Sequence, residues 1–180
     1  MTTARHLATI DEFRARLADA SGGGRGSHPG IRPGTHQGTP PGTHQGTPPG
    51  THQGTPPGTH PGVQPGFHLA ELATSEDFWE DDGTRRALAE EQYEAERDGL
   101  AALLTARWGP PVELDLWPLL ERSLAGESLP EPWSTLCADT PELRLWHDDD
   151  RWVGLGISQW DKQLPLRLLA VVTTEDPPQA

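Results

Sequence analysis

An octapeptide repeat near the N-terminus of this 180-residue chain limits what can fold around it. Three identical copies of Thr-His-Gln-Gly-Thr-Pro-Pro-Gly begin at Thr35, Thr43 and Thr51, and looser octads flank them, so the tract covers residues 27–66. The tract contains no Leu, Phe, Trp or Met, and it therefore has too little apolar surface to offset the entropy lost when a backbone is ordered. We predict that residues 27–66 form a disordered linker.

The repeat tract also separates two regions of different charge. Residues 1–66 contain 5 Arg and Lys against 3 Asp and Glu, a net charge of +2, whereas residues 67–180 contain 9 against 24, a net charge of −15. These values add up to the net charge of −13 of the whole chain. We expect an amphipathic helix and a glycine-rich segment at 1–26, the linker at 27–66, an acidic folded domain at 67–176 and a short tail at 177–180.

The acidity of the domain favours one class of partner over others. Nucleic acids and anionic membranes are bound through Lys and Arg, so we expect neither to be a partner, and a basic protein is the better candidate. The chain has no run of about 18 apolar residues and no secretory signal pattern at its N-terminus. A single cysteine, Cys137, is consistent with a reducing compartment, and we expect a cytoplasmic location.

Hydrophobic periodicity predicts helices in two parts of the chain outside the tract. Residues 7–20 carry Leu7, Ile10, Phe13 and Leu17 on one face, which predicts a short helix that forms only when it docks, either on its own domain or on another protein. Residues 84–107 predict a long helix that ends at Gly109. A capped first turn is expected at residues 75–79, and a short helix is expected from residue 118 to the glycine at 126.

Alternation with period two predicts strands at residues 112–116, 142–146, 152–157 and 166–173. Residues 147–151 would turn the second of these strands into the third. The predicted fold is therefore α+β, with a long and a short helix packed on a mixed or antiparallel sheet of about four strands.

Three of the seven tryptophans, Trp146, Trp152 and Trp160, are the candidate partner-binding residues, because they lie in a hairpin and the loop after it. If Leu143 and Leu145 share a face with Val153 and Leu155, then Trp146, Trp152 and two glycines share the other. That second face would be an exposed aromatic shelf or, alternatively, a core covered by a helix. Apolar residues of the last strand on the same face favour the covered alternative.

Six histidines recur with a period of eight residues, and imidazole is a common ligand of Zn, Ni and Cu. The candidate metal ligands within the tract are His28, His36, His44, His52 and His60; the sixth histidine, His68, follows the tract. The tract resembles the copper-binding octarepeats of prion proteins in its period, its Gly and Pro content and its single His per unit. It differs because Gln-Gly-Thr or Pro follows the histidine. A proline has no amide proton to lose, so its backbone nitrogen cannot bind the metal next to His28 and His60. The alternative is that the repeats are a tolerated linker enlarged by duplication.

No motif in the chain indicates catalysis. Cys137 is expected to be a buried structural thiol, and the acidic run beside His147 lacks the spacing of a calcium loop. The sequence therefore favours a non-enzymatic interaction module without a cofactor, an adaptor, chaperone or toxin-neutralising protein. Metal binding by the repeat tract is the alternative function.

Overall fold

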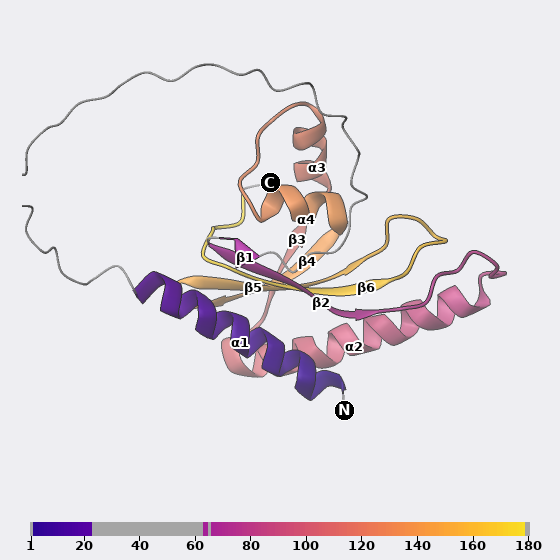
Figure 1. The fold of residues 1–180 in the computed structure, drawn as a ribbon, viewed down its shortest axis with the longest axis horizontal. Coiled ribbons are helices and arrows are strands. Elements are labelled where there is room, and N and C mark those ends of the chain that lie inside the picture. The colour runs from indigo at the N-terminus through magenta and orange to yellow at the C-terminus, as the bar shows by residue number, and fades with distance from the viewer. Residues whose placement is uncertain (1, 23–62, 65, 179–180) are drawn as a thin grey trace, which may run out of the picture.

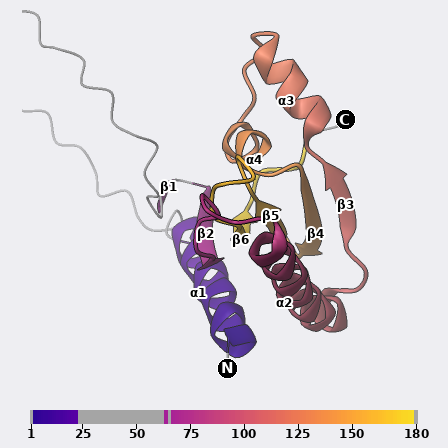
Figure 2. The same cartoon turned by 90° about the vertical axis from the view of Figure 1, so that its right-hand side faces the viewer.

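The computed structural model describes residues 2–22, 63–64 and 66–178, which form three layers with a β-sheet in the middle (Figure 1). Two helices, α1 and α2, cover one face of the sheet, and two shorter helices, α3 and α4, lie against the other (Figures 1 and 2). This arrangement confirms the predicted α+β class. The disorder proposed for residues 27–62 and all five candidate metal ligands lie outside the described residues. The prediction of a disordered linker up to residue 66 is wrong at its end, because Val63–Gln64 form strand β1 of the sheet.

The sheet is antiparallel throughout, and its strand order is β1-β2-β6-β5-β4-β3. The strands are β1 (Val63–Gln64), β2 (Phe67–Thr74), β3 (Val112–Asp115), β4 (Glu142–Asp148), β5 (Arg151–Ser158) and β6 (Arg167–Thr173). The four predicted strands correspond to β3, β4, β5 and β6. Strand β2 was not predicted; it follows the tract directly and pairs along its length with β6.

The helices are α1 (Thr2–Gly22), α2 (Thr84–Trp108), α3 (Trp117–Leu124) and α4 (Trp133–Asp139). The predicted long helix is confirmed in α2 and the predicted short helix in α3, whereas α4 was not predicted. The capped turn expected at residues 75–79 is wrong, because no helix is described there. The Ser75 hydroxyl instead accepts a hydrogen bond from the Leu166 amide, which holds this segment against the end of β6.

Helix α1 docks on its own domain, one of the two alternatives that the sequence left open. Ile10, Phe13 and Leu17 are buried in the same apolar cluster as the residues of α2 and the sheet. Phe13 stacks on His68 of β2 with ring centroids 5.1 Å apart. The N-terminal helix therefore completes the core, although about 40 residues separate it from β1.

The register of the β4–β5 hairpin differs from the one inferred from the sequence. Leu145 lies opposite Gly154, and Trp146 lies opposite Val153. Trp146 therefore shares its face of the sheet with Val153, and Trp152 points to the other face. The sequence could not fix this phase, because both faces of the sheet are covered by helices and both carry apolar residues.

Candidate partner-binding site

Trp146, a candidate partner contact, is not exposed, and the covered alternative that the sequence favoured is the one observed for it. Only 1% of its surface is accessible, and its indole nitrogen donates a hydrogen bond to the Thr105 hydroxyl of α2 at 3.2 Å. Trp146 is thus a core residue between the sheet and α2. The aromatic shelf made by Trp146 and Trp152 does not exist, because the two indoles lie on opposite faces of the sheet.

Trp152 is half-buried against the α3–α4 side of the core. Its indole nitrogen donates to Asp176 at 3.0 Å, and its ring meets the imidazole of His147 edge-on at a centroid distance of 4.6 Å. These contacts give Trp152 a structural role in holding the C-terminal segment. As a predicted partner contact, Trp152 therefore offers less free aromatic surface than expected.

Trp160 is exposed over 60% of its surface, and it lies in the loop between β5 and β6. Its indole nitrogen donates to Asp139 at 2.8 Å, and the same carboxylate accepts a hydrogen bond from Arg167 at 2.9 Å. Arg167 also donates to the Ser158 hydroxyl at 3.0 Å. One edge of the indole is therefore anchored while the ring remains accessible, which lowers the entropy cost of binding a partner.

A second exposed tryptophan lies at the same end of the molecule. Trp79 is 61% exposed, and it lies in the loop between β2 and α2. This loop is joined to the Trp160 loop by a backbone hydrogen bond from the Phe78 amide to the Gln163 carbonyl, 2.8 Å long. Trp79 is one of the seven tryptophans but not one of the predicted partner contacts, although three consecutive acidic residues follow it, a signal of exposure.

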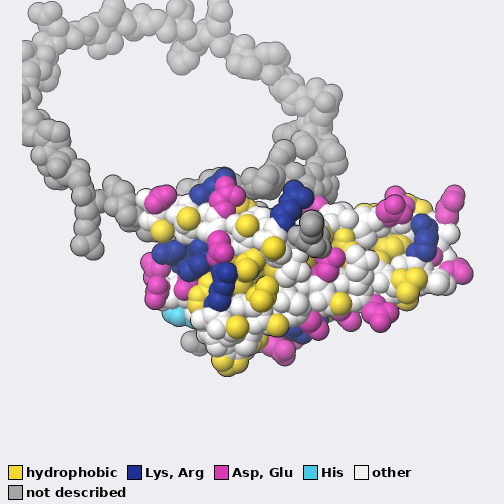
Figure 3. Space-filling view, turned by 90° about the horizontal axis from the view of Figure 1, so that it is seen from below, with side chains coloured by type: hydrophobic (Ala, Val, Ile, Leu, Met, Phe, Trp, Pro, Cys, Tyr) yellow, Lys and Arg dark blue, Asp and Glu magenta, His cyan; other side chains and the backbone are white. Residues whose placement is uncertain are grey.

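We call this region the acidic end and define it as residues 75–91 and 159–166. Its α2 portion adds Leu88, which is 62% exposed. Residues 75–91 contain seven Asp and Glu residues and two Arg residues. Figure 3 shows Asp and Glu side chains around hydrophobic ones at this end, on the right of the view. Exposed apolar side chains are thus surrounded by negative charge.

The Asp81 carboxylate of the acidic end has a structural role. Asp81 accepts hydrogen bonds from the backbone amides of Arg85 at 3.1 Å and Arg86 at 2.9 Å, in the first turn of α2. The hydrogen bond from the Arg86 amide is the main cause that lowers the pKa of Asp81, since it stabilises the ionised form. The carboxylates of Glu76, Asp77 and Glu80 belong to exposed residues that could meet a cationic partner.

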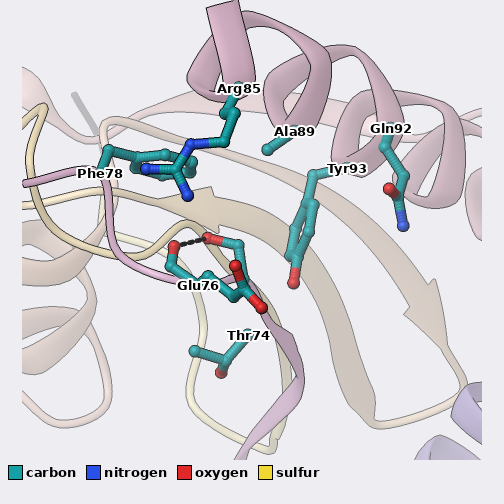
Figure 4. Close-up of a pocket in the computed structure, with 8 residues that line it drawn as sticks. Thr74, Glu76, Phe78, Arg85, Ala89, Gln92 and Tyr93 are labelled. Atoms are coloured by element: carbon teal, nitrogen blue, oxygen red, sulfur yellow. Dashed lines mark hydrogen bonds between the residues drawn. The ribbon is translucent and has the colours of Figure 1, made fainter. Parts of the chain in front are cut away.

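The acidic end also contains a shallow pocket of about 300 Å³ between α2 and the loop that follows β2. Figure 4 shows Arg85, Ala89, Gln92 and Tyr93 pointing from α2 toward Thr74, Glu76 and Phe78. Tyr93 and Phe78 are both buried and give the pocket aromatic walls. Burial raises the pKa of Tyr93, and the carboxylates of Glu96 and Glu71 add to the effect, so the phenol is neutral at physiological pH.

The described residues outside the tract contain no cluster of three or more His, Cys, Asp or Glu side chains suited to a metal ion. His68, the sixth periodic histidine, is buried beneath α1. Burial and the nearby Arg16 lower the pKa of His68, so its imidazole is neutral. Cys137 is buried as predicted, and burial raises the pKa of its thiol.

No known protein family, curated protein or solved structure matches the chain. No helix in the described part of the chain is long and apolar enough to span a membrane.

Proposed function

We propose that the protein is a non-enzymatic interaction module that binds a basic, amphipathic protein segment at the acidic end. The observation that carries this proposal is that two exposed tryptophans, Trp79 and Trp160, lie on loops joined by a backbone hydrogen bond, one of them beside a run of carboxylates. Large rigid side chains of this kind dominate the affinity of protein interfaces. An adaptor, a chaperone or a toxin-neutralising protein would use such a surface.

The charge of the acidic end supports a cationic partner. Five more acidic than basic side chains in residues 75–91 create a negative field that speeds association with a basic protein and repels nucleic acid. Apolar contact with Trp79 and Leu88 would then provide affinity that salt does not screen. We therefore propose a partner segment with basic residues on one side and an apolar stripe on the other.

The pocket gives this surface a place for one long side chain. Its aromatic walls suit the methylene stem of a lysine or arginine, and Glu76 at its mouth could pair with the cationic end. Arg85 lies beside Phe78 and is paired with Asp81 at 3.5 Å, which partly neutralises its charge. We place the interaction in the cytoplasm, a proposal with which the single free thiol of Cys137 is compatible.

Affinity purification from a lysate of the native host tests the proposal when full-length variants are compared by quantitative mass spectrometry. The double variant Trp79→Ala/Trp160→Ala should lose a basic partner that the unmodified chain retains. The control is Trp117→Ala, because Trp117 is 58% exposed but lies on α3, outside the acidic end.

Retention of the partner by the double variant would contradict the proposal. Equal loss from the Trp117→Ala control would contradict it as well, since the binding surface would then not be the acidic end. Raising the salt concentration should weaken the captured complex, because the carboxylates contribute through screened electrostatics.

A further inference from the structure

Helix α1 occupies the molecule in the way that a peptide ligand occupies a groove. The groove is formed by β2, β6, α2 and the β4–β5 hairpin, and we call it the α1 groove. The buried anchors of α1, Ile10, Phe13 and Leu17, follow helical spacing along one face. This is the helix-in-groove mode, in which a few apolar side chains of an amphipathic helix fill a hydrophobic channel.

Polar contacts fix the position of α1 in the groove. The Arg14 guanidinium lies over the Trp108 ring at 4.7 Å from the centroid, and its Nε donates to Asp148 at 2.8 Å. Asp11 pairs with Arg107 of α2 at 2.9 Å. Arg151 in turn donates to the Arg14 backbone carbonyl at 2.9 Å. Apolar anchors and charge pairs together make the groove selective for a helix with this pattern.

The contacts between α1 and the α1 groove do not require the helix and the groove to belong to the same molecule. Phe13 stacks on His68, and the strand partner of His68 is Val63, so α1 lies beside the start of the sheet that it joins. The 40 residues from 23 to 62 are therefore more than are needed to span the distance from α1 to β1. Every contact of α1 with the groove would be the same if the helix came from another copy.

We propose that the α1 groove is a binding site for the α1 helix of a second copy of this chain, with the chain's own α1 as a tethered competitor. A connection of 40 residues holds α1 at an effective concentration of about 1 mM, so the chain's own helix outcompetes a helix in trans at lower protein concentrations. Weakening the chain's own α1 must then strengthen binding of a helix in trans. This site is separate from the acidic end, so its failure leaves the proposed function intact.

The experiment measures fluorescence anisotropy of a fluorescein-labelled peptide of residues 1–22 titrated with the full-length chain. The unmodified chain should bind with an apparent Kd near or above about 1 mM, because its own α1 competes. The Phe13→Ala chain should bind the same peptide at least tenfold more tightly. The Arg5→Gln chain, altered at an exposed position of α1, should behave like the unmodified chain.

Arg14→Gln provides a second variant that weakens α1 without removing an apolar anchor, and it should also strengthen binding of the peptide. Peptide binding that is no tighter in either variant would overturn the proposal. Micromolar binding by the unmodified chain would also overturn it, because α1 would then not compete. A scrambled peptide that bound equally well would show that any amphipathic helix is accepted, and would likewise reject a specific second-copy site.

Discussion

Replacing Gly154 by alanine tests the observed packing between the central strands and the α3–α4 layer. A Cβ built at Gly154 would lie 2.7 Å from Val171 Cγ1 and 2.9 Å from Leu145 Cδ2. Both neighbours are almost wholly buried and lie on the strands that flank β5. The branched side chain of Val171 has few alternative rotamers, so it cannot move aside at low cost.

Overpacking of this kind lowers the free energy of unfolding by about 1–3 kcal/mol. Alanine also reduces the entropy of the unfolded chain, which offsets about 0.4–1 kcal/mol of that loss. We therefore expect Gly154→Ala to lower the free energy of unfolding by about 1–2 kcal/mol. Gly99→Ala is the matched control, because a Cβ at Gly99 meets no atom within 4 Å on helix α2. That change should raise the free energy of unfolding by about 0.5–1 kcal/mol.

Urea unfolding followed by far-ultraviolet circular dichroism measures both free energies, with equal slopes expected for the two variants. In the hairpin phase inferred from the sequence, Gly154 would lie with Trp146, away from Leu145. A Gly154→Ala chain as stable as the Gly99→Ala chain would therefore refute the observed register and the reasoning built on it.

Four further predictions concern His68 beneath α1, the tract (two predictions) and the core. Burial and Arg16 lower the pKa of His68, so the folded state favours the neutral imidazole. The free energy of unfolding should therefore fall as the pH drops below about 6.5, where His68 of the unfolded chain binds a proton. Urea midpoints measured from pH 8 to pH 5 should show a smaller loss of stability in the His68→Phe variant. Deleting residues 35–58 shortens the connection from 40 to 16 residues and should stabilise the docked state by about 0.8 kcal/mol, whereas a destabilised chain would show that the tract contributes contacts. The same deletion removes three periodic histidines, and calorimetric titration with Zn, Ni or Cu should detect fewer bound ions if the tract binds metal. Thr105→Val leaves the buried indole nitrogen of Trp146 without its partner and should cost about 1–3 kcal/mol in urea unfolding, while an unchanged midpoint would argue against that hydrogen bond.

The candidate site could be predicted only in part. The exposure of Trp160 agrees with the sequence analysis, since it lies in a polar loop between two strands. The location of Trp79 beside the Trp160 loop could not be predicted, because a backbone hydrogen bond joins segments more than 80 residues apart. The burial of Trp146 also depended on a distant element, helix α2, which supplies both its cover and its hydrogen-bond acceptor.

The sequence by itself determined the elements whose signals are local. The long apolar stripe and the terminal Gly109 predicted α2, and alternation predicted β3 to β6, because backbone geometry imposes these periods within each segment. The tertiary structure alone decided the phase of the β4–β5 hairpin, the docking of α1 and the hydrogen bond that joins the loops of Trp79 and Trp160. All three features depend on contacts between segments that are distant in the sequence. Because both faces of the sheet are apolar, the pattern within one strand does not determine which of its side chains point to which face.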